Sequence, residues 1–539
     1  MATPAFPAAG VCYTLPVRRI PLGSWLLAAV SGVLQVLIFP TPSLYFLSWI
    51  AVAPLLVAIL GPRPSAAPGE NAAPSLLRGF LLGFVCGLIF CAGNCYWIYY
   101  SMTVYGRLSP AAGAGVLVLL CVASAATDRG VFGLCLAWVA RRGGQRRALV
   151  LAPFLWVAVE LGRERLVGFP WDLLGYSQVD NIPLARIASL TGVWGIAFEL
   201  VLVNAAFAAA WYLPPPRRGR MVAASLLAAL VLQAGVLVKA PALPATHTAR
   251  LVQPDIPILD PVQWTEQRFG GTLTQMAALS LPAHGMAHPD LIVWPESPAP
   301  FWDNDARFRG LTGQVAMQAQ AWMVVGELGL GPDPAGGNLP LMFNSAALVA
   351  PRGEWAGRYD KIHLVPWGEY VPAKDLFSFA SKLTKESGDF TPGRRRLLLE
   401  AGGQRLGTFI CYESIFPDEV RQFAAQGAQV FVNISNDGWF GPGSAPGQHL
   451  NMARMRAIEN GRWLLRDTNS GITASIDPLG RVVDRAPRGV AAWLDAPYAL
   501  VPETTFYTRH GDWFPWLCAI ISLGALLFSF PLPRRAPRN

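Results

Sequence analysis

Apolar residues are unevenly distributed along this chain of 539 residues. Long runs with few charges fill about residues 20 to 240 and return at 514–531, whereas the stretch between them carries most of the carboxylates. Such runs approach the roughly 20 residues that cross about 30 Å of hydrocarbon as a helix. We therefore expect about eight transmembrane helices, at residues 22–39, 44–60, 76–100, 111–140, 149–162, 184–212, 221–239 and 514–531.

The pattern changes between about residues 245 and 505. Short β-branched or apolar runs alternate there with helical stretches and with turns rich in Gly, Pro, Asn and Asp, which predicts a layered α/β domain. The runs expected to be buried strands begin at Leu291, Trp322, Ser345, Gly407 and Val430, and His449–Arg462 is expected to be a helix. The predicted parts are an N-terminal arm (1–21), helices one to seven (22–240), the α/β domain (245–505), helix eight (514–531) and a basic tail (532–539).

Composition and charge agree with a membrane protein. Hydrophobic residues make up 53% of the chain and charged residues 14%, far from the usual soluble balance. The net charge of +9 comes almost wholly from arginines in short loops between apolar runs. Nucleic-acid binding would need basic residues gathered on one folded face, so we exclude it.

The arginines also predict the topology, because positively charged loops stay in the cytoplasm. With eight spans, the basic groups fall on one face, both termini are cytoplasmic, and the α/β domain lies outside the cytoplasm. Splitting the fourth span at Asp128–Arg129 is the alternative, and it would reverse every later loop. The basic groups are Arg18 and Arg19, Arg63 and Arg78, Arg141 to Arg147, Arg217 to Arg220, and Arg534 to Arg538.

Several polar features of the apolar segments have structural explanations. Ionisable groups in a bilayer are costly, so we expect Asp128, Glu160 and Glu199 to face protein, with Arg129 or Arg163 as partners. The crowded cysteines Cys86, Cys91 and Cys95 have no nearby histidine and are expected to be buried apolar residues, not metal ligands. The aromatic loop 168–177 is expected to anchor the protein at the membrane surface.

Cys411 is the strongest chemical signal. It is the only cysteine between about residues 241 and 509, and it ends the strand-like run from Arg405, so it has no evident disulfide partner and is a candidate nucleophile. Glu296 and Lys361 also follow strand-like runs. A thiol needs a base to become nucleophilic, and a cation stabilises the oxyanion that forms when a carbonyl is attacked. Each residue alone would be a weak signal, but the set suits acyl chemistry.

Seven motifs around these residues resemble the carbon–nitrogen hydrolase (nitrilase) superfamily over about residues 247–500. The helices before and after that region narrow the resemblance to its membrane-bound branch, the apolipoprotein N-acyltransferase family, and extend it over nearly the whole chain. Trp367 replaces the usual phenylalanine, without an evident chemical consequence. The motifs are Val252-Gln-Pro-Asp-Ile-Pro, Trp294-Pro-Glu-Ser, Phe343-Asn-Ser, Tyr359-Asp-Lys-Ile-His-Leu-Val-Pro-Trp-Gly-Glu-Tyr-Val-Pro, Ile410-Cys-Tyr-Glu-Ser, Asn436-Asp-Gly-Trp-Phe-Gly and Thr468-Asn-Ser-Gly.

The resemblance implies a multi-pass α-helical membrane domain joined to a nitrilase-like αββα sandwich. It implies that Glu296 is the base, Lys361 the oxyanion partner and Cys411 the acylated nucleophile. Three further residues would support the catalytic ones, and three others, assigned more weakly, match positions of the substrate pocket or a mobile arm. The supporting residues are Glu369, Tyr412 and Glu413, and the substrate-binding candidates are Trp264, Asn344 and Trp439.

The reaction implied by the resemblance has two halves. Cys411 takes the sn-1 acyl chain from a membrane phospholipid, and the N-terminal amine of a diacylated apolipoprotein then removes it as an amide, in the bacterial inner membrane. No cofactor or metal is expected, since the chain has no phosphate-binding Gly-rich loop and no clustered His/Cys set. We expect a monomer. His363 and His449 are expected to be structural.

Two alternatives remain at this point. The same triad would serve a membrane-tethered amidase that passes the acyl group to water. A non-enzymatic scaffold or transporter with a decayed domain is the other alternative.

Overall fold

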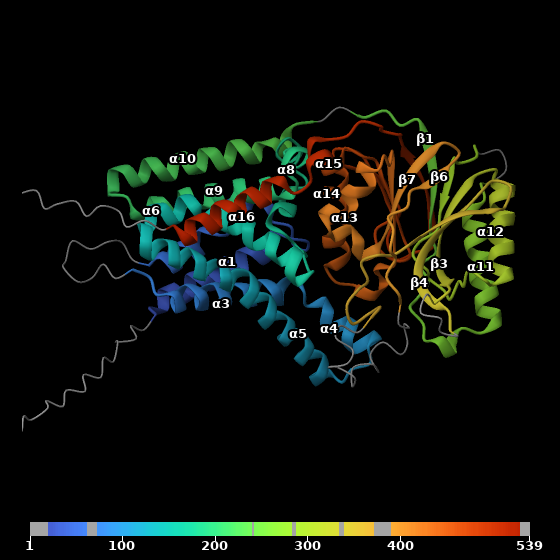
Figure 1. Cartoon of the computed structure of the whole chain (residues 1–539), viewed down its shortest axis with the longest axis horizontal. Helices are drawn as coiled ribbons and strands as arrows, with labels where there is room; N and C mark the ends of the chain where they lie inside the picture. The colour runs from blue at the N-terminus through green and yellow to red at the C-terminus, as the bar shows by residue number, and fades with distance from the viewer. Residues whose placement is uncertain are drawn as a thin grey trace, which may run out of the picture.

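The computed structural model describes residues 20–61, 73–239, 242–282, 287–333, 339–370 and 390–528. A helical bundle and a domain built of two sheets lie side by side (Figure 1). The chain passes from the bundle into the sheet domain after α10 and the short η6, and returns to the bundle with α15 and α16. The expected basic arm, Arg63 and the tail at 532–539 lie outside the described residues.

Four described helices are long and apolar enough to cross a membrane, at Leu76–Asn94, Pro110–Val167, Val193–Tyr212 and Pro215–Leu237. Shorter apolar helices lie at Leu22–Leu37, Tyr45–Leu60, Ile182–Thr191 and Trp513–Leu527. A count of eight crossings is therefore not confirmed and stays a prediction. The helices of the bundle are α1 (Leu22–Leu37), η1 (Tyr45–Trp49), α2 (Ala53–Leu60), α3 (Leu76–Asn94), α4 (Trp97–Tyr100), η2 (Ser101–Tyr105), α5 (Pro110–Ala125), η3 (Ala126–Gly130), α6 (Val131–Gly162), η4 (Arg163–Val167), η5 (Leu174–Gln178), α7 (Ile182–Ala185), α8 (Ala188–Thr191), α9 (Val193–Tyr212), α10 (Pro215–Gln233), η6 (Ala234–Leu237), α15 (Phe506–His510) and α16 (Trp513–Leu527).

The longest of these apolar segments is a hairpin. Gly144 has a φ of 81°, which breaks the helix within the arginine cluster. Phe132 and Trp156, twelve residues before and after it, pack with their rings 5.0 Å apart. The chain therefore doubles back at Gly144, and the spans predicted at 111–140 and 149–162 are the two arms of the hairpin.

The charged pair at Asp128–Arg129 does not end the first arm. The helix continues through it as one π-helical turn, Ala126–Gly130, so the alternative that splits the span there is wrong. Asp128 is buried and paired with Arg129 and with Arg163, whose Nη1 lies 2.8 Å away on the second arm. The expected arginine partners of Asp128 are confirmed.

The other two carboxylates of the apolar segments differ from Asp128. Glu160 is buried and accepts a hydrogen bond from the backbone N–H of Leu174 at 2.9 Å, so it fixes the loop that follows η4. Glu199 is half-buried on α9.

Glycines let α3 approach the hairpin closely. A Cβ built on Gly83 would lie 1.9 Å from the carbonyl oxygen of Arg129, and one on Gly79 would lie 2.3 Å from that of Gly133. Small residues at helix contacts allow this approach in membrane proteins, where van der Waals packing holds helices together. Cys86, Cys91 and Cys95 are buried on and just after the same helix, as expected.

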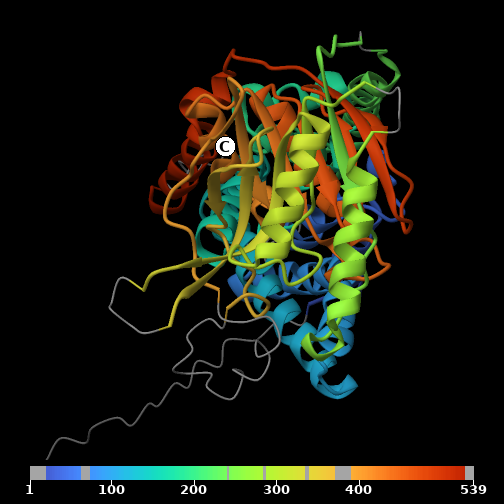
Figure 2. The same ribbon diagram turned by 90° about the vertical axis from the view of Figure 1, so that its right-hand side faces the viewer.

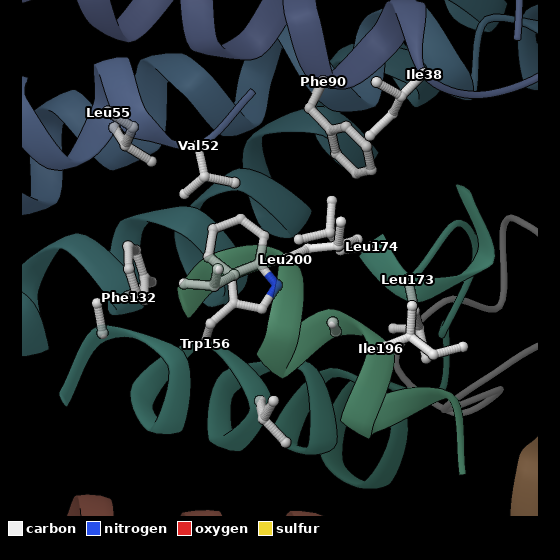
Figure 3. Close-up of a cluster of buried hydrophobic side chains, with 14 of the residues drawn as sticks. Ile38, Val52, Leu55, Phe90, Phe132, Trp156, Leu173, Leu174, Ile196 and Leu200 are labelled. Carbon is white, nitrogen blue, oxygen red and sulfur yellow. The ribbon is translucent and has the colours of Figure 1, made fainter. Parts of the chain in front are cut away.

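The bundle has one apolar core at its centre. Trp156 of α6 lies there beside Leu200 of α9 and Phe132, with Leu55 of α2 and Val52, the residue before α2, close by (Figure 3). All five side chains are at most 2% exposed.

The sheet domain contains two six-stranded sheets within the described residues. Their strand orders are β12-β1-β2-β3-β4-β5 and β11-β10-β9-β8-β7-β6. All five predicted strands are confirmed. The strands are β1 (His247–Gln253), β2 (Leu291–Val293), β3 (Trp322–Gly331), β4 (Leu341–Val349), β5 (Trp355–Asp360), β6 (Leu399–Ala401), β7 (Gln404–Ile410), β8 (Val430–Ser435), β9 (Leu464–Thr468), β10 (Ala474–Ile476), β11 (Val482–Arg485) and β12 (Ala492–Tyr498).

Helices cover the outer face of each sheet. The helices α11 (Glu266–Ser280) and α12 (Ala306–Ala319) pack on the first sheet and face the viewer in Figure 2. On the bundle side, α13 (Pro417–Ala425) and α14 (Ala445–Asn460) cover the second sheet (Figure 1). The expected four-layer αββα sandwich is therefore confirmed.

The aromatic loop 168–177 lies between the two parts. Trp171 is 1% exposed and Tyr176 is fully buried. Trp171 donates through Nε1 to Gln448 of α14 at 2.8 Å, and Tyr176 accepts from Arg456 of the same helix at 3.0 Å. The prediction that this loop anchors the protein at the membrane surface is wrong, because its aromatic side chains instead fill the junction between bundle and sandwich.

The close helix contact predicts that Gly83→Ala destabilises the protein. The added Cβ would collide with backbone, which neither helix can move without loss of packing, and such overpacking costs about 1–3 kcal/mol. Unfolding of the purified protein in detergent, followed by tryptophan fluorescence against temperature, measures the loss.

Gly115→Ala on α5 is the matched control, because nothing lies within 4 Å of its added Cβ. It should leave the midpoint unchanged or raise it slightly, since alanine favours a helix over glycine. Equal effects of the two variants would contradict the packing account.

Candidate active site

The sheet topology brings three chain segments to one edge of the sandwich. Strands β2 and β3 are parallel, while β4 is antiparallel to β3 and to β5, so β2 and β5 point the same way. Glu296 lies just beyond β2 and Lys361 directly follows β5. Cys411 directly follows β7 in the facing sheet. Polar residues at strand ends are where α/β folds place their sites.

Lys361 is the centre of the site and is 1% exposed. Its Nζ donates to Glu296 Oε1 at 3.1 Å and to Glu369 Oε1 at 2.9 Å. Burial alone would lower the pKa of Lys361, but Glu296 and Glu369 outweigh it and raise the pKa. The lysine is therefore a permanent cation at neutral pH.

Asn344, on β4, holds the same two carboxylates. Its Nδ2 donates to Glu296 Oε1 at 2.7 Å and to Glu369 Oε1 at 2.6 Å. The second oxygen of each carboxylate accepts from backbone, Glu296 from Asn436 N at 2.8 Å and Glu369 from Val365 N at 2.7 Å. Asn344, expected only as a pocket residue, thus belongs to the polar cluster around Lys361.

Cys411 begins the short helix η9 (Cys411–Ile415) in a left-handed conformation, with a φ of 49°. Such a φ is uncommon for a residue with a side chain, and strain of this kind gathers at functional sites. Burial and the Glu296 carboxylate raise the pKa of the Cys411 thiol, while Lys361 opposes them. The resting thiol is therefore protonated and needs a base, and it lies within electrostatic range of both charged residues.

Glu413 supports the site from η9. Its carboxylate accepts from Tyr359 OH and from the backbone N–H of Ile362, each at 2.7 Å, and from the N–H of Ile410 at 2.7 Å. Burial and Glu419 raise the pKa of Glu413 to about 7. The side chain ties the segment carrying Lys361 to the turn carrying Cys411, and so it is a structural clamp between the two sheets.

Tyr412 joins the turn at Cys411 to the bundle. Its hydroxyl donates to the carbonyl oxygen of Gly168 at 2.8 Å, and the side chain is 6% exposed. Tyr412, Ile415 and Phe416 pack into the apolar core of the bundle. The turn that positions Cys411 is therefore held partly by the helical bundle.

The two tryptophans expected near the substrate lie outside the Lys361 cluster. Trp439 is 41% exposed, packs its ring 5.3 Å from that of Tyr105, and accepts a hydrogen bond from Ser101 at its carbonyl oxygen. It thus faces the end of the bundle. Trp264 is half-buried beside α11, on the outer face of the first sheet.

The sequence predicted no site role for four polar residues near Cys411. Ser414, Asp437, His449 and Arg466 form a buried hydrogen-bonded chain that reaches the carbonyl oxygen of Cys411. Asp437 and Ser414 are in two of the quoted motifs, but only the fold brings His449 to them. His363 instead contacts Glu419 at 3.2 Å and stacks on Phe416.

Both parts of the chain match known families. Residues 248–493 match the carbon-nitrogen hydrolase model, and residues 31–206 match the model of the apolipoprotein N-acyltransferase N-terminal domain. An apolipoprotein N-acyltransferase of Geobacter metallireducens is 38% identical over 510 residues, covering 93% of this chain and 94% of that protein. The chain belongs to the apolipoprotein N-acyltransferase family.

Other apolipoprotein N-acyltransferases match over a similar extent. That of Pseudomonas aeruginosa PAO1 is 35% identical over 522 residues, covering 93% of this chain and 95% of that protein. That of Azotobacter vinelandii is 34% identical over 539 residues, covering 95% and 96%. Membership of the apolipoprotein N-acyltransferase family makes the chain an enzyme, and its apolar helices fit a bacterial membrane protein.

The charges around Cys411 predict opposite effects of two substitutions. Glu296→Gln should lower the pKa of the Cys411 thiol by removing a negative charge, and Lys361→Gln should raise it. The pH dependence of iodoacetamide alkylation at Cys411, followed by peptide mass, measures both shifts. If Glu296 is the base, as the resemblance implies, acyl transfer should still fall by about 100-fold or more in Glu296→Gln.

Glu266→Gln provides the control, since that carboxylate is 85% exposed on α11. It should change neither the alkylation profile nor the rate. An unchanged profile in Glu296→Gln would show that this carboxylate does not act on the thiol.

Proposed function

We propose that this enzyme moves the sn-1 acyl chain of a membrane phospholipid to the N-terminal amine of a diacylated apolipoprotein, through a thioester on Cys411. The observation that carries the proposal is the position of Cys411 between the bundle and the sandwich. The turn that follows Cys411 packs into the apolar core of the helical bundle, while Lys361 and its carboxylates approach from the sandwich. A thiol held at this junction suits substrates whose reacting groups lie at the level of lipid headgroups.

In the first half-reaction, Glu296 takes the proton of Cys411 and the thiolate attacks the sn-1 ester carbonyl. The oxygen becomes an oxyanion, which Lys361 and backbone N–H groups stabilise. The C–O bond then breaks, Glu296 returns the proton to the leaving alkoxide, and a lysophospholipid departs. The acyl chain remains on sulfur as a thioester.

In the second half-reaction, the α-amine of the diacylglyceryl-cysteine attacks the thioester carbonyl. Glu296 accepts a proton from the attacking nitrogen, the C–S bond breaks, and Cys411 is restored as a thiol after proton transfer. Exchanging an ester for a thioester is nearly balanced and forming the amide is downhill, so neither half needs ATP. A covalent intermediate gives ping-pong kinetics.

Three further features belong to the proposal. The arginine pattern supports eight crossings, cytoplasmic termini and a sandwich on the periplasmic side of the inner membrane. Trp439 at the end of the bundle and the half-buried Trp264 are the proposed substrate contacts. One chain supplies the whole Lys361 cluster, so we propose a monomer.

Intact mass tests the covalent step. Purified wild-type protein incubated with phosphatidylethanolamine should gain the mass of one acyl chain, and Cys411→Ala should gain none. An undiminished adduct in Cys411→Ala would exclude Cys411 as the nucleophile. The matched control is Cys518→Ala, which removes another buried cysteine, on α16 of the bundle. This variant should still gain the acyl chain.

A membrane-tethered amidase with the same three residues is the rival function. Wild-type protein given labelled phospholipid and a diacylated lipopeptide should yield labelled N-acylated lipopeptide. Release of free fatty acid without that product would favour the rival.

A further inference from the structure

A chain of buried polar side chains reaches the backbone of the nucleophile. His449 of α14 places Nε2 3.1 Å from the carbonyl oxygen of Cys411 and 2.7 Å from Ser414 Oγ. Its Nδ1 lies 3.0 Å from Asp437 Oδ1. His449 and Ser414 are fully buried and Asp437 is 1% exposed. These groups therefore cannot meet a substrate directly, and any influence on the reaction must pass through Cys411.

His449 has hydrogen-bond partners at both ring nitrogens. A carbonyl oxygen can only accept, so a hydrogen bond from the ring to Cys411 O requires the proton on Nε2. Nδ1 lies 3.0 Å from Arg466 Nη2, which donates, and 3.0 Å from Asp437 Oδ1, which accepts. Burial and the Arg466 cation lower the pKa of His449. Arg466 and Ser435 in turn donate to Asp437, at 2.8 and 2.7 Å. The ring is thus fixed at both nitrogens.

The contact with the carbonyl oxygen matters because a trans peptide is planar. The carbonyl of Cys411 and the N–H of Tyr412 belong to one plane and point in opposite directions. Anchoring the oxygen therefore sets the direction of that N–H and holds Cys411 in its left-handed conformation. Both the thiol and a backbone donor beside it depend on this orientation.

The membrane part contacts the same histidine. Trp171 stacks on His449, with ring centres 5.8 Å apart and planes 24° apart. Trp171 also donates to the adjacent Gln448, whose Nε2 donates to the carbonyl oxygens of Pro40 and Asn94 in the bundle, at 3.1 and 3.2 Å. Two successive residues of α14 thus link the bundle to the nucleophile.

We propose that His449 is a positioning residue that holds the Cys411 peptide for attack, and that Trp171 seats His449 from the membrane part. The inference rests on the proposed function, since it concerns the formation of the Cys411 thioester. On this account the bundle does more than bring lipid near the site, because it also completes the geometry of the nucleophile.

Two substitutions with side chains of similar length distinguish the effect of the hydrogen bond to Cys411 O from the effect of filling the space of the His449 ring. His449→Gln keeps an N–H donor for the Cys411 carbonyl, whereas His449→Met fills similar volume without one. The rate of acyl-adduct formation from phosphatidylethanolamine is measured by mass in full-length protein, under single-turnover conditions. The Met variant should acylate about 100-fold more slowly, as for a misplaced reacting group, and the Gln variant should stay within about tenfold of wild type.

The lipid concentration that gives half the maximal rate should be unchanged in both variants. A general loss of folding would instead lower the fraction of protein that is acylated and leave the rate constant of the folded part unchanged. A Met variant that acylates like wild type overturns the inference, as does a Gln variant no faster than a folded Met variant. A wild-type protein that forms no adduct would instead overturn the proposed function.

The coupling to the membrane part is tested with Trp171→Leu. We expect about a tenfold slower acylation from this change alone and little further loss when it is added to His449→Met, because both act on one element. If the acylation rate of the double variant falls by the product of the two single losses, the coupling is overturned. If His449→Met does not fold, an unchanged acylation rate in Trp171→Leu overturns it as well.

Discussion

The buried ammonium of Lys361 is the constraint on which the site depends. A charge taken out of water costs several kcal/mol unless it is fully partnered, and here Glu296 and Glu369 both contact it. Two carboxylates and one ammonium leave a net charge of −1, which Asn344 and backbone N–H groups offset. In the proposed reaction, transfer of the Cys411 proton to Glu296 preserves that total. The thiolate therefore forms without adding a second uncompensated charge to a buried site.

The buried Lys361 cluster can act on Cys411 only if the two sheets pack in the right relative position. The cluster around Lys361 is built on the first sheet, and the turn at Cys411 follows a strand of the second. Glu413 bonds across this division to Tyr359 and to the backbone after Lys361. On its other side the turn packs against the helical bundle through Tyr412 and Phe416. Cys411 is thus held between the first sheet, the second sheet and the helical bundle, and contacts from all three keep its strained backbone in place.

The sequence predicted the features that have local signals. Alternating apolar runs gave the strands before Glu296 and Cys411, and the order of Glu, Lys and Cys motifs gave the candidate triad. The arginines at 141–147 predicted a loop between two apolar segments, and the structure places the reversal of the chain there, at Gly144. Asn344 was predicted only as a pocket residue, because its contact with both carboxylates requires the pairing of β4 with its neighbours.

Other features could not be predicted from local pattern. The aromatic residues of 168–177 have the composition of a membrane-surface loop, and only the docking of α14 shows that Trp171 and Tyr176 are buried against protein. His449 stands on a helix 38 residues beyond Cys411, and no spacing rule joins them. Apolar length likewise does not fix the number of crossings, since several apolar helices of the bundle are shorter than a membrane is thick.

The central claim is that one acyl chain rests on Cys411 between two lipid substrates. The most direct test isolates the acyl-enzyme formed from a labelled phospholipid, removes the donor and adds a diacylated lipopeptide alone. The account predicts that the label leaves the protein and appears as amide on the lipopeptide, one chain for each adduct lost. Label that stays on the protein, or that appears only as free fatty acid, would contradict it.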